Sequence, residues 1–211
     1  MFDNFTLRRY VSGSVYDVEN LAKKIVNCTN PVKFNDPVDS FFYFVDEKRF
    51  KNSKEVLTND IIERIRICCF VDYEKISRER KGQNLTANEI LMWTHYANAH
   101  NGLCFEYSIP RQDFEYLEPK DSFNESKKIL HSIKYMHDFA SDFDSVLSNI
   151  ENENKAYGEL LNTIFFTKDV AFEYEEEKRL LVYADDKSED YCSCKFDYLK
   201  KLFLEKDAPK I

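Results

Sequence analysis

The chain has 211 residues and a mass of 25.1 kDa, which suits one domain with a substantial core. Hydrophobic residues make up 43% of the sequence and aromatic residues 15%, so we expect an ordered fold although the mean hydropathy of -0.56 is polar. The formal net charge of -8 repels nucleic acid at long range and argues against general nucleic-acid binding.

The start of the chain and its cysteines indicate a reduced, cytoplasmic protein. Residues 1–4 lack the basic and apolar regions of a secretion signal, and no stretch approaches the roughly 20 apolar residues that span a bilayer. The six cysteines form no Cys-x2-Cys pair, and the four histidines are not at zinc-finger spacing from them. We therefore expect no disulfide framework, no metal site and no membrane contact.

The first part of the chain predicts a helix, a turn and a strand. Apolar residues at helical spacing predict a helix over residues 18–27, and the Asn-, Asp- and Pro-rich segment 33–39 follows as a loop. A β-favouring run predicts a strand over residues 65–71. The sequence contains only four Gly and five Pro and no flexible linker, so residues 1–211 are expected to form a single domain.

The middle of the chain predicts a helix followed by strands. Thr86 is a candidate N-cap for a helix over residues 87–97, which Gly102 ends. Partial alternation of apolar and polar residues predicts a strand over residues 103–109 and another over residues 129–135. The intervening zone is polar.

The last part predicts a long helical region and two closing strands. Apolar residues at three- and four-residue steps predict one or two helices over residues 139–166, and strands are expected over 178–183 and 196–204. Helices and strands are interspersed without a βαβ rhythm. We therefore expect an α+β fold, with a mixed sheet core and flanking helices.

The segment from Leu91 to Tyr107 concentrates residues that can carry chemistry. On a helix Trp93 and Tyr96 share a face, whereas His95 is turned by about 200° from Trp93 at roughly 100° per residue. These residues are either a binding surface or core aromatics beside a surface histidine, and both interpretations remain open.

His95, His100 and Glu106 in the same segment allow a third interpretation, a metal-dependent hydrolase. The two histidines are five residues apart, whereas a spacing of four places two ligands on one helical face.

A second segment carries alternating charges. Glu173, Glu175, Glu177 and Arg179 lie two residues apart, so on a strand all four would project to one face. Such a face is either solvated or lines a cleft in which Arg179 holds a neighbouring carboxylate ionised. On a helix, by contrast, Glu175 would leave the face of the other two glutamates.

Near the N-terminus, Arg8 and Arg9 precede Tyr10. A guanidinium binds phosphate through two parallel hydrogen bonds, so this pair could hold a phosphate-bearing ligand. Two adjacent arginines are also ordinary surface residues. Nucleotide-binding glycine loops, nucleophile elbows and EF-hand loops are absent from the sequence.

Taken together, these motifs resemble those of a bacterial and phage family, the domain-of-unknown-function family 2971. The resemblance runs over residues 7–183. It rests on R-R-Y at 8–10, F-N-D-P-V-D at 34–39, C-F at 69–70, L-M-W-T-H-Y-A-N-A-H-N-G-L-C-F-E at 91–106, I-K-Y at 133–135 and T-K-x-x-x-F-x-x-E-x-E-x-R at 167–179.

The layout of these motifs is similar to that of ADP-ribosyltransferase domains. The resemblance implies that Arg9 with Tyr10 engages the ribose or phosphates of NAD, and that Tyr96 or His95 orients the nicotinamide ribose. Glu175 or Glu177 would bond the ribose 2′-hydroxyl, because cleavage of the nicotinamide bond develops positive charge that a carboxylate stabilises.

The remaining candidate ligand contacts come from the same motifs: Arg8, Asn35, Asp36, Trp93, Lys168 and Arg179. The leading hypothesis is an ADP-ribosyltransferase-like protein that binds NAD or a related nucleotide, in a toxin, phage-defence or counter-defence setting that includes a protein target. The rival is a non-catalytic module that sequesters a nucleotide signal or a partner protein, with Arg9, His95 and Arg179 as phosphate contacts.

Overall fold

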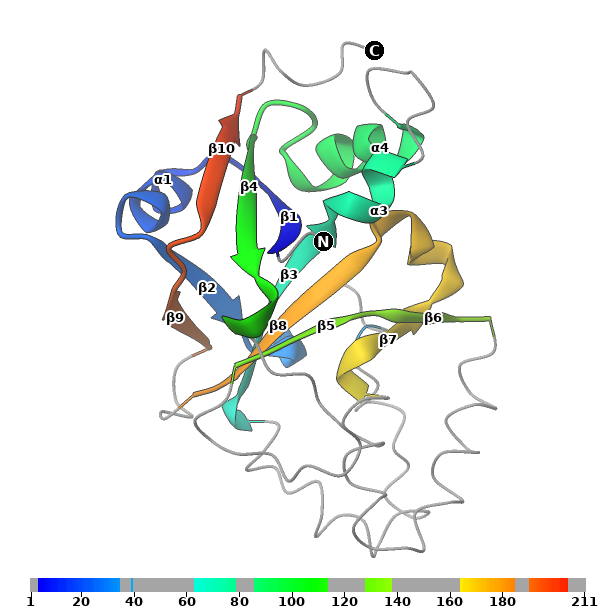
Figure 1. Ribbon diagram of the computed structural model, residues 1–211. Helices are drawn as coiled ribbons and strands as arrows, with labels where there is room; N and C mark the ends of the chain where they lie inside the picture. The colour runs from blue at the N-terminus through cyan, green and yellow to red at the C-terminus, as the bar shows by residue number, and fades with distance from the viewer. Residues whose placement is uncertain are drawn as a thin grey trace, which may run out of the picture.

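The computed structural model describes residues 4–34, 39, 63–78, 86–113, 128–137, 164–184 and 190–204 (Figure 1). The predicted helical region over 139–163 and the motif residues Asn35 and Asp36 lie outside these residues. Within the described part of the chain, no helix is long and apolar enough to cross a membrane. The fold is α+β, with an antiparallel main sheet and a few helices.

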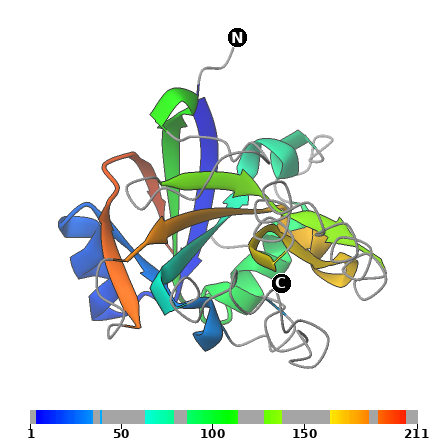
Figure 2. The ribbon, with the colours of Figure 1, turned by 90° about the horizontal axis from the view of Figure 1, so that it is seen from below.

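The main sheet has eight strands (Figures 1 and 2). Its main path runs β10-β4-β1-β3-β2-β9, and β8 pairs with both β3 and β5. These strands are β1 (Asn4–Val11), β2 (Ile25–Thr29), β3 (Ile65–Asp72), β4 (Leu103–Pro110), β5 (Ile129–Ser132), β8 (Glu177–Tyr183), β9 (Tyr191–Lys195) and β10 (Leu199–Phe203). A separate parallel pair joins β6 (Lys134–Met136) to β7 (Thr167–Asp169).

The sheet forks along one edge of β3. Near one end β1 pairs with β3 at Arg8 and Val71, whereas further along β2 pairs with β3 at Thr29 and Ile67. Cys69 lies between these two points. The Asp72 N–H donates to Glu176 O on the β8 side, so strand alternation turns the peptide groups of Cys69 toward the fork. Among the described strands, none forms a β-ladder pair with Cys69 on this edge.

Short helices connect the strands and cover parts of the sheet. They are α1 (Val15–Ala22), η1 (Pro31–Lys33), α3 (Tyr73–Arg78), α4 (Ala87–Tyr96), η3 (Arg111–Asp113) and η4 (Val170–Glu175). Both α1 and α4 begin with a capping box, in which Ser14 and Thr86 bond the backbone three residues ahead and the acidic residue there returns the bond. Helix α4 packs beside η4, and both lie near β8 (Figure 1).

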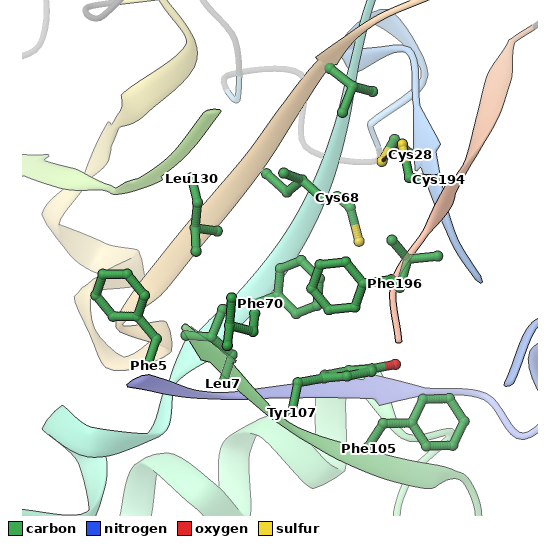
Figure 3. Packing of buried hydrophobic residues seen from close by; sticks show 14 of the residues in the cluster. Phe5, Leu7, Cys28, Cys68, Phe70, Phe105, Tyr107, Leu130, Cys194 and Phe196 are labelled. Atoms are coloured by element: carbon green, nitrogen blue, oxygen red, sulfur yellow. Dashed lines mark hydrogen bonds between the residues drawn. The ribbon is translucent and has the colours of Figure 1, made fainter. Parts of the chain in front are cut away.

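Strand alternation places a hydrophobic cluster on each face of the sheet. One face carries the larger cluster, in which the Phe70 and Phe196 rings stack with centroids 5.2 Å apart and Tyr107 meets both edge-on (Figure 3). The other face packs Tyr10 and Trp93 with residues of α3, α4 and β4. The second face also carries the polar site described below.

Several predicted elements are confirmed within a residue or two: the strands that became β3, β4 and β8, and helix α4 with its Thr86 cap. The strand over 129–135 is split into β5 and β6, and the strand over 196–204 is shortened to β10. The helix over 18–27 is wrong in part. Helix α1 ends at Ala22, Lys24 adopts a left-handed conformation (φ 55°), and the β-branched residues Ile25 and Val26 begin β2.

Gly102, which ends the turn after α4, is required for steric reasons. Its N–H bonds Ala97 O at 2.8 Å, and a Cβ at this position would meet Val11 O at 2.1 Å and Ala97 C at 2.8 Å. Both obstacles are backbone atoms, so neither can swing aside.

We expect Gly102→Ala to lower the free energy of unfolding by about 3 kcal/mol, because the added methyl forces the backbone apart. Gly13→Ala is the control: its φ of +78° is strained for alanine, but the nearest atom to its Cβ is 3.4 Å away. A cost of about 1 kcal/mol is expected there. Urea unfolding measures both, and equal losses would contradict the steric argument.

Candidate functional site

A buried guanidinium organises the polar site on the second face of the sheet. Arg179, in the middle of β8, has no solvent exposure. Its Nη2 donates to both Asp39 oxygens at 2.6 and 2.7 Å, its Nε to Glu177 Oε1 at 2.7 Å, and its Nη1 to Phe165 O at 3.0 Å. The two carboxylates and the carbonyl satisfy this buried cation.

The ammonium of Lys168 links the same carboxylates to a third one. Its Nζ lies 2.8 Å from Glu175 Oε2, 3.3 Å from Glu177 Oε2 and 3.6 Å from Asp39 Oδ2. Tyr96 on α4 donates its phenol to the other oxygen of Glu175. Three carboxylates thus meet two cations, which leaves one net negative charge when all five groups are ionised. We call Asp39, Lys168, Glu175, Glu177 and Arg179 the charge cluster.

The pKa values of the two glutamates of the charge cluster are shifted in opposite directions. Burial alone would raise the pKa of Glu177, but Arg179 and then Lys168 outweigh it and lower that pKa to about 2. Burial raises the pKa of Glu175 above its ordinary value, and the nearby Glu177 charge acts in the same direction against the opposing Lys168 ammonium. Glu177 is therefore a fixed anion, whereas Glu175 is the one closer to accepting a proton.

Glu175 belongs to the site, but it lies on a different secondary-structure element from the one predicted. The prediction that four alternating charges share one strand face is wrong for Glu173 and Glu175, which lie in η4, where Glu173 is exposed. Glu176 is left-handed (φ 42°, ψ 51°) and separates η4 from β8. Only Glu177 and Arg179 lie on the strand. The left-handed turn nevertheless returns Glu175 to the same cluster.

The motifs of the family resemblance converge on this cluster although they are far apart in sequence. The F-N-D-P-V-D motif contributes Asp39 and also Phe34, whose ring lies 5.7 Å from the Arg179 guanidinium. In the I-K-Y motif, Tyr135 Oη accepts the Glu177 N–H at 2.8 Å. The C-F motif contributes Cys69, which lies directly opposite Arg179 on the neighbouring strand. Asp39, Cys69 and Tyr135 were not among the predicted site residues, although each lies in a motif.

A cavity of about 340 Å³ opens beside the charge cluster. Tyr96, Glu175 and Glu177 line one part of it, together with Lys168 and Phe172, whose ring lies 4.6 Å from the Lys168 ammonium. The cavity extends over β3 into the fork of the sheet, where its lining includes Arg9, Asn27 and Cys69. The volume lies within the range of small-molecule sites.

Arg9 supplies the positive end of this cavity. Its Nη2 bonds Asn27 O across the fork at 3.4 Å, which is a long contact. Among the described residues no carboxylate forms an ion pair with it, and its pKa is raised: the nearby thiols of Cys68 and Cys28 and the Tyr107 phenol outweigh the lowering by burial. Arg9 is therefore a charged donor with capacity for an anion.

Arg8, the neighbouring candidate, is fully engaged elsewhere. Its Nε and Nη2 bond Glu106 Oε2 at 3.0 and 2.9 Å, and its Nη1 bonds Glu89 Oε1 at 3.0 Å. The guanidinium also lies 3.4 Å from the centroid of the Tyr73 ring. These contacts tie β1 to α4 and β4, so Arg8 acts in stability although part of it borders the cavity.

The remaining candidates separate into cavity, core and surface positions. Tyr10 borders the cavity but packs edge-on against Trp93 at 5.5 Å, and Trp93 itself is buried and does not line the cavity. His95 is exposed, lies 6.1 Å from the Tyr174 ring centroid and is also outside the lining.

His95, His100 and Glu106 are not arranged as the metal-dependent hydrolase interpretation requires. The imidazole of His100 lies 2.8 Å from Thr94 Oγ1, Glu106 is paired with Arg8, and His95 is exposed on α4. Among the described residues, these three side chains do not form a group that could share a metal ion.

Comparison with known proteins supports the family resemblance over the part of the chain that carries most of this site. Residues 92–180 match the model of a family described as Protein of unknown function (DUF2971). The matched segment runs from α4 into β8 and contains Tyr96 and four of the five members of the charge cluster. No curated protein and no solved structure matches the chain. The family description names no activity, so the chemistry must be argued from the cavity.

The low pKa of Glu177 predicts a specific acid sensitivity. Its folded-state pKa of about 2 lies below the ordinary value of 4.5, so its contribution to stability is complete above that value and is lost as the pH falls toward 2. The contribution is on the order of 3 kcal/mol.

We expect Glu177→Gln to lower the free energy of unfolding at neutral pH and to flatten its fall between about pH 5 and 2. Glu175→Gln is the matched control, because ionisation of a carboxyl whose folded-state pKa is raised opposes folding and so cannot cause that fall. Urea unfolding across this pH range measures both slopes. A Glu177→Gln slope equal to that of the wild type would contradict the assignment.

Proposed function

We propose that the cavity binds NAD or a related nucleotide and that the chain transfers or hydrolyses ADP-ribose. The observation that carries the proposal is the meeting of Arg9, Tyr96, Glu175 and Glu177 around one cavity, with Arg9, which forms no ion pair with a described carboxylate, at one end and the carboxylates at the other. A dinucleotide presents a pyrophosphate anion beside a ribose whose C1′ becomes positive during cleavage. The two ends of the cavity have the charges that such a ligand needs.

In the proposed reaction each carboxylate has a different role. The bond between C1′ and the nicotinamide nitrogen breaks, and its electron pair stays with the nitrogen, so nicotinamide leaves as a neutral molecule. Glu177, a permanent anion, stabilises the oxocarbenium character at C1′. Glu175 bonds the ribose hydroxyl and accepts the proton of the water or acceptor group that adds to C1′. The raised pKa of Glu175 suits it to proton transfer.

The Tyr96 phenol supports the same division of roles. Burial and the Glu175 charge raise its pKa, so the phenol keeps its proton and remains a hydrogen-bond donor to Glu175 at neutral pH. Tyr96 is 41% exposed and lines the cavity, so its ring is also available to contact a ligand. Tyr96 would therefore orient both the carboxylate and the bound ribose.

A second candidate function is nucleotide binding without turnover. The observation that favours it is the pairing of Glu177 with Arg179 and Lys168, which offsets much of the negative charge that a transition state would use. A binding module needs Arg9 and the aromatic walls but no reactive carboxylate.

Measuring nicotinamide release from NAD together with calorimetric binding of NAD and ADP-ribose distinguishes the two functions. For an enzyme we expect Glu175→Gln and Glu177→Gln to retain binding but to lose release by at least about 100-fold, as expected when a charge that acts at the transition state is removed. Glu173→Gln is the control, since Glu173 is an exposed glutamate of the same segment. Binding without release by the wild type would establish the binding module, and absence of both would refute both functions.

Arg9 provides a test that is independent of catalysis. Removing one charged hydrogen-bond donor from an anion costs about 1.5–3 kcal/mol, so Arg9→Met is expected to weaken ADP-ribose binding by roughly 10- to 100-fold. Arg9→Lys should recover part of that loss, because it keeps the charge without the planar fork. Calorimetry gives both affinities, and unchanged affinity of Arg9→Met would place the ligand phosphates elsewhere.

A further inference from the structure

Three cysteine thiols meet at the far side of the fork, away from the charge cluster. Cys28 lies on β2 directly opposite Cys192 on β9, and Cys194 follows two residues later on the same face of β9. All three sulfur atoms lie within 4.8 Å of one another, and the Cys28 and Cys194 sulfurs are 3.9 Å apart. Figure 3 shows Cys28 and Cys194 side by side at the edge of the larger hydrophobic cluster.

The sulfur spacing is that of ligands around one metal ion. A zinc–sulfur bond of about 2.3 Å in a tetrahedron places neighbouring sulfurs about 3.8 Å apart. The separation of 3.9 Å between Cys28 and Cys194 is close to this value. A disulfide would need about 2.05 Å. The strand register therefore holds the three free thiols within 4.8 Å of one another, close enough to share one metal ion and without a disulfide.

The surroundings fit a thiolate site. Cys28 is fully buried and Cys194 is 8% exposed, whereas the half-buried Cys192 gives access from solvent. A cationic side chain acts electrostatically on each thiol: Arg9 on Cys28, Arg66 on Cys192 and Lys128 on Cys194. These charges offset the negative charge that remains on a metal ion with three thiolates.

A metal at this position would also reinforce a weak part of the sheet. Among the strands that the structure describes, β9 pairs only with β2, and β2 pairs with β3 at the single position Thr29–Ile67. Cys68 on β3 interacts with Cys28 but does not belong to the group of three sulfurs. The proposed site would connect β2 and β9 where the hydrogen-bonded ladder to the rest of the sheet is short.

We propose that Cys28, Cys192 and Cys194 bind a soft, thiolate-preferring metal ion, with zinc as the ion that best fits their spacing. Soft sulfur ligands select zinc or copper(I) over magnesium, calcium or manganese. The site is separate from the proposed nucleotide chemistry, although Arg9 approaches both.

The test uses the full chain, purified with a reductant that does not bind metals. Elemental analysis is expected to find zinc equimolar with protein. Cobalt(II) added to metal-free protein should give the sulfur-to-cobalt charge-transfer band and the intense visible bands of tetrahedral cobalt. Removing the metal with a chelator should lower the melting temperature, because a metal that binds only the folded state stabilises it.

Cys28→Ser and Cys194→Ser should abolish stoichiometric zinc and the cobalt spectrum, whereas Cys104→Ser, a buried cysteine of the other cluster, should keep both. The wild-type measurements decide the matter even if a variant fails to fold. Absence of zinc and of the cobalt bands in the wild type would overturn the proposal. So would a disulfide among the three cysteines in peptide mapping, or equal loss of metal in Cys104→Ser.

Discussion

The buried guanidinium of Arg179 is the interaction on which the rest of the site depends. A cation without solvent exposure must be matched inside the protein, and here it is matched by Asp39, which is distant in sequence, and by Glu177, which lies two residues before it. Asp39 stands 140 residues before Arg179, so this one ion pair holds a residue that is distant in sequence against β8. Lys168 then offsets the negative charge that Arg179 leaves on Asp39 and Glu177, and its ion pair with Glu175 holds that carboxylate in the cluster.

The sheet provides the complementary half of the site. Because β1 and β2 diverge along β3, the cavity reaches through the sheet toward Arg9, whose side chain belongs to the opposite face. Carboxylates and a cation are thereby held at two ends of one space without neutralising each other. Neither face of an uninterrupted sheet could present both groups to one ligand.

Local patterns predicted the strongly periodic elements well. The Thr86 cap of α4 and the apolar runs of β3 and β8 were predictable from the sequence because each is determined by neighbouring residues. Strand β1 was not recognised because two arginines interrupt its apolar alternation, and their partners lie far along the chain. Strand β9 was not recognised either, since Tyr191–Lys195 carries small polar and sulfur side chains at an exposed edge.

The site was predictable only in its parts. Strand phase explains why Glu177 and Arg179 share a face, but the left-handed Glu176 changes the phase before Glu175, and no propensity marks a glutamate for that conformation. The expectation of no metal site rested on the spacing of the cysteines along the sequence. The pairing of Cys28 with Cys192 arises from sheet register, which spacing along the sequence does not reveal.

The fork also links ligand charge to the shape of the sheet. The hydrogen bond from Arg9 to Asn27 O crosses the gap between β1 and β2, and the peptide of Cys69 faces the same gap without a partner among the described strands. An anion bound to Arg9, as proposed above, would compete with that crossing hydrogen bond, and occupancy of the cavity would then be thermodynamically coupled to the separation of the two strands.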